Sequence, residues 1–415
     1  MSFLSRLFRA STIENPGVPI STSNILSWLA GGYTNETAGV PVSEARVLGL
    51  PAYYRACAIT AGTLAGLPIK VFKVGTREKV SRPTVLDKPN PRQTPFEFWQ
   101  TMFLNGITWG NMFARKVRDG RGDVVQLWPI HPSRVRVAEI TPTSSIPDGK
   151  VYILDGNERY TSDEIFHLPY LSCDGLAGVR PLELFRTSLG IAIAGDATAA
   201  AFYQNGSRIQ GILTTDQKLD DEVADRIKAR WQQVTGGVDN AGKITVLGSG
   251  AKFQAIALPP GDAQLLESRQ WSVSEISRMV GVPPHLIGDV EKSTSWGTGI
   301  EEQVLGWVKF TLQGWITGNE QRIGLELIRS NEYAKTILEG LLRGDAQTRA
   351  ALYKAGITDG WLNRNEVREL EDREPADGLD EFIVPSNMSI IAVDGHATPV
   401  APPSTPVPPD QGVPQ

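Results

Sequence analysis

The chain has 415 residues, and its 41 lysines and arginines against 46 aspartates and glutamates give a formal net charge of -5 at pH 7. This length is enough for the buried cores of two or three domains. The slight excess of negative charge argues against a protein that holds DNA by neutralising many phosphates. Two cysteines cannot build a disulfide framework, and the four histidines lack the spacing of metal ligands. We therefore expect a globular protein without a structural metal or a cofactor.

No stretch of the sequence predicts a membrane-spanning segment. The longest apolar stretch, residues 182–203, carries Glu183, Arg186 and Asp196, whereas a spanning helix needs about 20 largely uncharged residues. The N-terminal MSFLSRLFRAST has two arginines and no continuous apolar core, so it is a poor signal peptide. We expect no membrane partner.

Residues 1–46 are rich in Ser, Thr, Gly and Pro without a sustained period, which predicts a mobile N-terminal arm. A helix then begins at Pro51 and ends at Gly66. The residues expected on its apolar face are Tyr54, Cys57, Ala58, Ala61 and Leu64. The strand PIKVFKV follows, and Thr94 with Glu97 forms a capping box for a second helix. That helix is expected to bury Phe96, Trp99 and Phe103.

After the second helix, apolar residues recur at every second position, as is typical of β-strands. NMFARKVR and VVQLWPI, joined by DGRGD, predict a hairpin whose Asp119-Gly120 supplies the tight turn. VRVAEI, KVYIL and EIFHL read as further strands. Residues 47–180 are therefore predicted to form an α+β domain.

Residues 181–206 have a helical pattern crowded with small residues, among them Gly190, Gly195 and Ala199. Small side chains let helix backbones approach closely. The composition alone fits two alternatives equally well: a helix packed against copies of itself in a ring, and an interior helix of a monomer.

Residues 207–258 read as strand, helix and strands, with Asp220 as the helix cap. Gly237, Gly242 and Lys243 match a phosphate-binding G-x-x-x-x-G-K pattern. Ile244 replaces the magnesium-binding Ser or Thr, and the order helix, loop, strand is the wrong one. We interpret the segment as a turn and keep a nucleotide-binding enzyme that uses residues 237–243 as an alternative. No nucleophile, base and orienting group stand in a recognisable arrangement, so no catalytic residue is predicted.

A helix is predicted from Asp262 to Gly281, because Pro283 and Pro284 follow. Residues 282–299 are rich in Pro, Gly, Ser and Thr and predict a loop. A long helix starts at Ile300 and keeps one apolar face, formed by Val304, Val308, Leu312, Ile316, Ile323 and Leu327. YAKTIL is expected to return as a strand to the first domain. Asp345 and Asn363 begin two short helices, and residues 385–415 are predicted to be disordered.

GVPPHLIGD and the GIEEQ that opens the long helix resemble the portal proteins of tailed bacteriophages. KPNPRQTPFEFW, the WGNMFARKVRDGRGDVVQLWPIHPSRV hairpin, AAAFYQNGS and LLRGDAQTRAALYKAGITDGWLNRNEVREL occur in the order of that family, from about Leu50 to Asp372. The resemblance implies a dodecameric ring at one capsid vertex, which serves genome packaging, head-tail joining and DNA ejection.

The resemblance also implies a portal fold of the α+β class: an α/β wing at 47–180, helical stem segments at 181–206 and 259–281, an inserted α/β clip at 207–258, a tunnel loop at 282–299, a long wing helix with its return strand at 300–344, and a small helical crown at 345–384. The acidic crown sequence would repel packaged DNA. Asp239, Asn240 and Lys243 are the candidate clip contacts to a partner.

The tunnel loop is expected to touch DNA through Lys292, its only basic residue, and through Ser293, Thr294 and Ser295. The implied partners are further copies of the chain, the terminase packaging motor, the major capsid and scaffolding proteins, a head-tail adaptor, and double-stranded DNA bound without sequence specificity. The implied location is the virion, with assembly in the host cytoplasm. A non-channel adaptor protein remains a second alternative.

Overall fold

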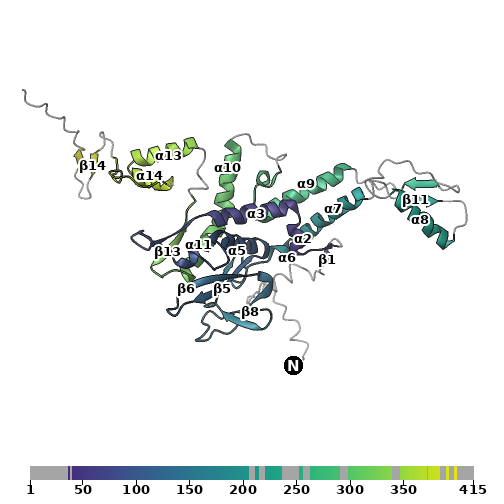
Figure 1. Cartoon of the computed structure of the whole chain (residues 1–415), viewed down its shortest axis with the longest axis horizontal. Helices are drawn as coiled ribbons and strands as arrows, with labels where there is room; N and C mark the ends of the chain where they lie inside the picture. The colour runs from purple at the N-terminus through teal and green to yellow at the C-terminus, as the bar shows by residue number, and fades with distance from the viewer. Residues whose placement is uncertain are drawn as a thin grey trace, which may run out of the picture. The chain divides into compact units, whose positions relative to one another are not determined.

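The computed structural model describes residues 36–37, 40–204, 211–214, 220–235, 252–255, 262–289, 298–338, 346–371, 373–383, 389–391 and 397–399. The chain divides into two compact units, Met1–Ile337 and Leu338–Gln415 (Figure 1). None of the described helices is long and apolar enough to cross a membrane.

Two long helices pack against each other in the first unit. These are α3 (Pro51–Gly66) and α5 (Pro95–Trp109). The expected capping box of α5 is confirmed: the Thr94 side chain accepts from the Glu97 amide, and the Glu97 carboxylate accepts from the Thr94 amide at 2.8 Å. Gly110, with a φ of 70°, ends the helix in the left-handed conformation.

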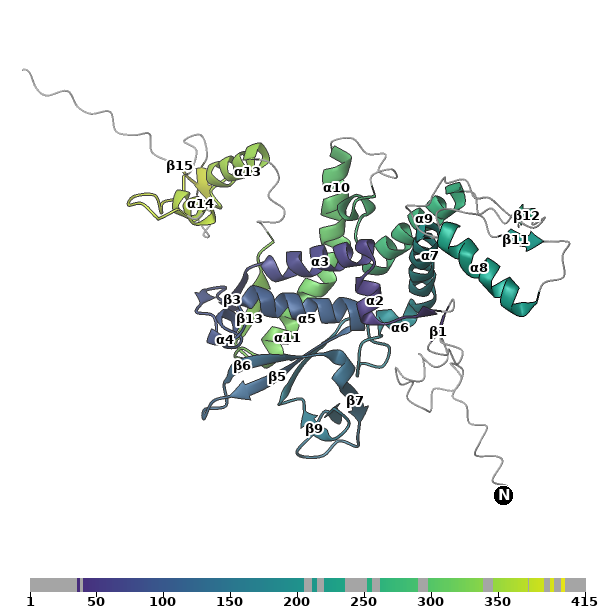
Figure 2. The same ribbon diagram turned by 45° about the vertical axis from the view of Figure 1, so that its right-hand side comes forward.

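Two three-stranded antiparallel sheets follow α5 in the chain. The first has the order β10 (Ile165–Pro169), β5 (Asn111–Arg118), β6 (Val124–Ile130), and the second the order β7 (Val135–Glu139), β8 (Lys150–Leu154), β9 (Glu158–Thr161). The sheets share a core of Phe113, Ile130, Val135, Tyr152, Leu154 and Ile165. Figure 2 shows α5 between α3 and the β5–β6 hairpin. The predicted hairpin and strands are confirmed, except that Gly122, not Gly120, takes the positive φ of the turn, at 91°.

A long helical segment returns the chain to this domain. It consists of α10 (Thr298–Trp307), a π-helical segment (Val308–Leu312) and α11 (Gln313–Glu326). The next strand, β13 (Glu332–Thr336), pairs with β3 (Ile69–Lys73), which also pairs with β4 (Lys79–Val80). The prediction that this strand returns to the first domain is therefore confirmed, and strands far apart in the sequence pair in one sheet.

Between β10 and the long helix the chain forms α6 (Pro181–Leu184), α7 (Arg186–Gln204) and α9 (Asp262–Val280). The insert between α7 and α9 contains β11 (Gly211–Thr214), α8 (Asp221–Thr235) and β12 (Lys252–Ala255), and its two strands pair antiparallel. Phe185 interrupts the single helix predicted for residues 181–206.

The second unit contains α13 (Ala346–Thr358), α14 (Arg364–Leu370) and a hairpin of β14 (Ser389–Ile391) with β15 (Ala397–Pro399). The Asn363–Glu366 capping box that begins α14 is confirmed. The hairpin lies in the segment predicted to be disordered, whose remaining residues are outside the described ones.

Several sequence expectations differ from the structure. Tyr54 and Phe96 are 61% and 44% exposed, whereas Tyr53 and Phe98 are buried in their place. The predicted arm also contains ordered residues: β1 (Glu36–Thr37) pairs with β2 (Val40–Pro41), and Ser43 caps α2 (Glu44–Leu48). Glu44 accepts a hydrogen bond from Trp109 Nε1 at 3.0 Å, which fixes α2 to the end of α5. The remaining short helices are α4 (Thr84–Asp87), a 3-10 turn at Pro132–Arg134 and another at Pro284–Ile287.

Candidate functional site

The predicted stem residues lie on α7, which packs side by side with α9 (Figure 1). Gly190 is buried, and Ala199 is buried at 9% exposure. Gly195 is half-buried, and a Cβ built at this position would meet no atom within 4 Å. The three small residues therefore differ: Ala199 is buried within the chain, whereas Gly195 borders open space among the described residues.

The predicted tunnel loop begins at a tightly bonded helix end. The amides of Gly281 and Val282 both donate to the Ser277 carbonyl, at 2.9 and 3.1 Å, and Ser277 Oγ donates to the Val282 carbonyl. Gly281 has a φ of 75°, a conformation that favours glycine. The chain therefore leaves α9 in a fixed direction.

The π-helical segment of the long helix holds this helix end. Thr311 Oγ1 donates to the Gly281 carbonyl at 2.9 Å, and a Cβ at Gly281 would lie 3.0 Å from Thr311 Cγ2. On the other side of the loop base, Arg55 Nε of α3 donates to the Leu286 carbonyl at 3.4 Å. A π-helical turn widens the helix and is often found at functional sites. The base of the loop is therefore attached to both α3 and the long helix.

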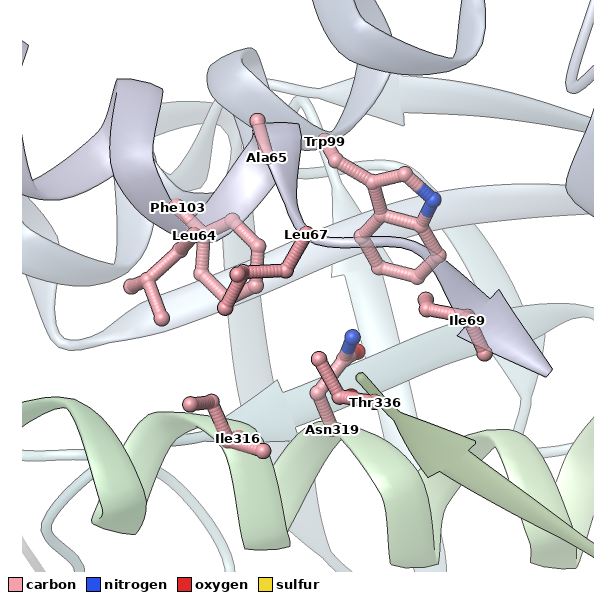
Figure 3. Close-up of a pocket in the computed structure, with 9 residues that line it drawn as sticks. All are labelled: Leu64, Ala65, Leu67, Ile69, Trp99, Phe103, Ile316, Asn319 and Thr336. Carbon is pink, nitrogen blue, oxygen red and sulfur yellow. The ribbon is translucent and has the colours of Figure 1, made fainter. Parts of the chain in front are cut away.

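The long helix is attached to α5 and to the end of β10 through tryptophan packing. Trp315 stacks on Tyr170, with ring centroids 3.7 Å apart and an angle of 2° between the planes, and it meets Phe103 edge to face at 6.3 Å. A Cβ at Gly106 would lie 2.7 Å from the Trp315 ring, so only glycine admits this contact. Beside it, Asn319 lines a cavity of about 10 Å³, together with Leu67, Ile69, Thr336 and other residues (Figure 3).

A buried ion pair fixes the far end of the same helix. Lys116 Nζ on β5 lies 2.7 Å from Glu326 on α11, and the two side chains are 2% and 12% exposed. Lys116 Nζ also donates to the Ser162 carbonyl, and Arg322 binds the second Glu326 oxygen at 2.9 Å. Removing one partner of such a buried pair leaves an uncompensated charge. The orientation of the long helix, and so of the loop it carries, is thus determined at several points.

His167 on β10 is the centre of a buried polar network. Its Nε2 lies 3.0 Å from Asn111 Oδ1, which also accepts from the Gly178 amide, and its Nδ1 lies 3.2 Å from the Tyr152 hydroxyl. Because Asn111 Oδ1 can only accept, Nε2 carries the proton of the neutral ring. Burial holds the pKa of His167 well below its usual range, and the positive charges of Lys150 and Arg322 lower it further. This histidine is therefore a structural group that stays neutral.

The structure reaches only part of the predicted site. Lys292, Ser293, Thr294 and Ser295 of the loop lie outside the described residues, as do Asp239, Asn240 and Lys243 of the clip and the whole 237–243 segment. Sequence reasoning missed the Gly281–Thr311 contact and the Lys116–Glu326 pair. Gly281 followed by Pro283 signalled a helix end, but no local pattern reveals which distant residue meets it.

No group of three or more potential metal ligands occurs in the described ranges of the chain. His285 Nδ1 and Nε2 are buried without a hydrogen-bond partner among these residues. Of the larger grooves in the described part, one near α3 is lined mainly by apolar residues together with Gln100 and Thr101, and one in the second unit is lined by three arginines and Glu371, among other residues. The candidate site therefore consists of the packed helices α7 and α9 and of a loop whose base is held by hydrogen bonds.

Three comparisons with known proteins agree with this architecture. The profile of the phage portal protein family matches residues 51–372. The portal protein of Enterobacteria phage HK97 is 34% identical over 355 residues, which cover 81% of this chain and 82% of that protein. In structure, the chain is similar to an HK97-family phage portal protein from Corynebacterium diphtheriae, with a TM-score of 0.57 and 17% identity over 73% of this chain and 98% of the other.

A second structural neighbour comes from the neck of a native gene transfer agent particle, computed with C12 symmetry. The TM-score is 0.52 at 20% identity, and the match covers 87% of this chain and 96% of the other. The HK97 relative and the family profile each span most of the chain, and the similar solved structure covers 73% of it. This chain therefore belongs to the phage portal protein family, with the structural role of a portal protein.

Proposed function

We propose that twelve copies of this chain form a ring at one capsid vertex, and that double-stranded DNA passes through its central hole. DNA enters through the ring during packaging and leaves through it during ejection, and the ring also joins head to tail. The observation that carries the proposal is the match of residues 51–372 to the portal family. The twelvefold symmetry of the similar neck structure supports the subunit number.

Within this ring, residues 47–180 and 300–344 form the wing, α7 and α9 the stem, 207–258 the clip, 282–299 the tunnel loop and 345–384 the crown. The side-by-side packing of α7 and α9 supports the stem assignment. The rigid attachment of Gly281 to Thr311 supports a loop that projects from a fixed base into the channel.

The proposed partners follow from the same position at the vertex. The clip meets the terminase motor and later the head-tail adaptor, and the wing meets the major capsid and scaffolding proteins. The DNA contacts are independent of base sequence because the loop offers a cation and hydroxyl groups to phosphates. The protein resides in the virion after assembly in the host cytoplasm and acts without catalysis.

Electron microscopy and native mass spectrometry of the purified chain test the proposal. We expect rings with a central hole and a mass of twelve subunits. A monomer at all concentrations would contradict it. Rings that assemble into capsids but neither admit nor retain DNA would favour the non-channel adaptor. ATP hydrolysis that disappears in Lys243→Ala would favour the nucleotide-binding alternative, whereas we expect no hydrolysis in either protein.

A further inference from the structure

Two features of the wing helices have no role in the fold just described. The first is Phe310, which is 81% exposed in the π-helical segment. Its neighbours Val308 and Leu312 are buried, and each is two residues away, so Phe310 lies on the opposite side of the helix from the packed face. Leu305, one turn earlier, is 52% exposed. The long helix therefore presents a protruding apolar side chain away from its own domain.

The second feature is an open groove between α2, α3 and α5, with a volume of about 470 Å³. Its apolar lining comes mostly from Leu48, Tyr54, Cys57, Ala58 and Leu104, and no charged residue among the described ones lines it. Burial raises the pKa of the Cys57 thiol to about 12, which agrees with an apolar environment. A groove of this kind suits an aromatic or aliphatic side chain and disfavours phosphates and charged peptides.

The groove and Phe310 belong to different sides of the wing. On α5, Phe103 and Gly106 contact Trp315 of the long helix, whereas Thr101 and Leu104 line the groove. At about 100° per residue, Leu104 is roughly 160° around the helix from Gly106. The groove thus opens on the face of α5 that points away from α11. A copy that offers an apolar projection on one side and an apolar groove on another has the two different surfaces that head-to-tail ring contacts require.

We propose that Phe310 of one copy inserts into the α2–α3–α5 groove of the adjacent copy and forms an apolar contact between neighbouring wings. This inference rests on the proposed ring, and a second copy is the occupant because both complementary surfaces occur on one chain.

Disulfide trapping tests the contact directly. Phe310→Cys is combined with Ala58→Cys in a chain whose native cysteines are removed by Cys57→Ala and Cys173→Ser. Oxidation of assembled rings is expected to give a ladder of covalent oligomers on a non-reducing denaturing gel. The matched control joins Phe310→Cys with Gly120→Cys at the exposed hairpin tip and is expected to give no ladder. Phe310→Cys with Tyr54→Cys, both at exposed positions, replaces the first pair if Ala58→Cys prevents folding.

The outcomes separate this inference from the proposed ring. Rings that form normally but give no ladder with either pair would overturn the inference and leave the ring intact. Failure of the unmodified chain to form rings would overturn both.

As an independent measurement, Phe310→Asp is expected to raise the protein concentration for half-maximal ring assembly roughly tenfold or more. Leu325→Asp, at a position that is 75% exposed on α11, serves as its control and is expected to leave assembly unchanged. Equal assembly of the Phe310→Asp variant and the unmodified chain would also contradict the contact.

Discussion

Asn319 is a buried polar residue at the junction of α3, α5 and α11. Its Oδ1 has no hydrogen-bond partner among the described residues, and its side chain points into the small cavity beside Ile316 and Thr336 (Figure 3). An unpaired buried polar atom costs about 1–3 kcal/mol. Asn319→Leu keeps the branching of the side chain at Cγ and removes the unpaired polar atom, and we expect it to raise the free energy of unfolding by about 1 kcal/mol in urea titrations. Asn319→Ala enlarges the cavity and is expected to be less stable than the Leu variant; the reverse order would show that the amide stabilises this junction.

His167 makes the stability of the wing depend on pH. Its pKa in the folded chain lies well below 6.5, so the unfolded chain binds a proton more readily as the pH falls. The contribution of this residue is therefore complete above about pH 6.5 and decreases below it, by up to about 1.4 kcal/mol per pH unit. We expect His167→Gln, which cannot titrate, to flatten the decrease in unfolding free energy between pH 6.5 and 5. An unchanged slope in that variant would assign the acid sensitivity to other groups.

Elements whose signals are local could be predicted from the sequence. Both capping boxes, at Thr94 and Asn363, depend on residues three apart, and the β5–β6 hairpin depends on adjacent strands and their turn. The prediction of which residues α3 and α5 bury was partly wrong, because the spacing of apolar residues could not decide between neighbouring aromatic residues such as Tyr53 and Tyr54. That choice depends on tertiary packing.

The helices and the loop of the candidate site could be predicted from the sequence, but the tertiary contacts that hold them in place could not. The end of α9 follows from Gly281 and the prolines after it, whereas the π-helical segment interrupts a pattern that reads as one regular helix. Its contact to Gly281 through Thr311 joins residues 30 apart, and the Lys116–Glu326 pair joins residues 210 apart. The period of apolar residues along the chain carries no information on such pairs, so they can be identified only from the three-dimensional structure.

The stem helix α7 gives a prediction that separates contacts within one chain from contacts between copies. Because a Cβ at Gly195 meets nothing within 4 Å, Gly195→Trp is expected to leave the folding of the chain intact and to disturb ring assembly. Ala199→Trp is less informative, since Ala199 is buried inside the chain. Native mass spectrometry gives the ring population, and circular dichroism checks the helix content. Gly324→Trp on α11, where a Cβ also meets nothing, is the control; full rings from the Gly195 variant would remove α7 from the subunit interface.

At the scale of the whole molecule, the C-terminal segment 385–415 falls in the second of the two compact units. Its described strands, β14 and β15, pair with each other, and both belong to the second unit, Leu338–Gln415. We expect deletion of residues 385–415 to leave ring assembly unchanged and to lower the melting temperature by less than about 2 °C. A large decrease in melting temperature, with rings lost, would show that this segment packs against the rest of the assembly.

In the proposed ring, the tunnel loop is the part of each copy that we expect to meet the passing DNA. Its base is held by Thr311 and Arg55, so in the proposed ring we expect all copies to present Lys292 at one level of the channel. Asp289 and Glu291 beside it weaken the attraction for phosphate, which suits DNA that slides and is not held. Lys292→Glu replaces a positive charge by a negative one in every copy. We expect rings to form normally and DNA packaging or retention in reconstituted particles to change, with an effect that weakens as the salt concentration rises. Lys88→Glu, at an exposed wing position, controls for the change in net charge. If both variants package and retain DNA as the unmodified protein does, Lys292 does not contact DNA, and the loop acts through its shape alone.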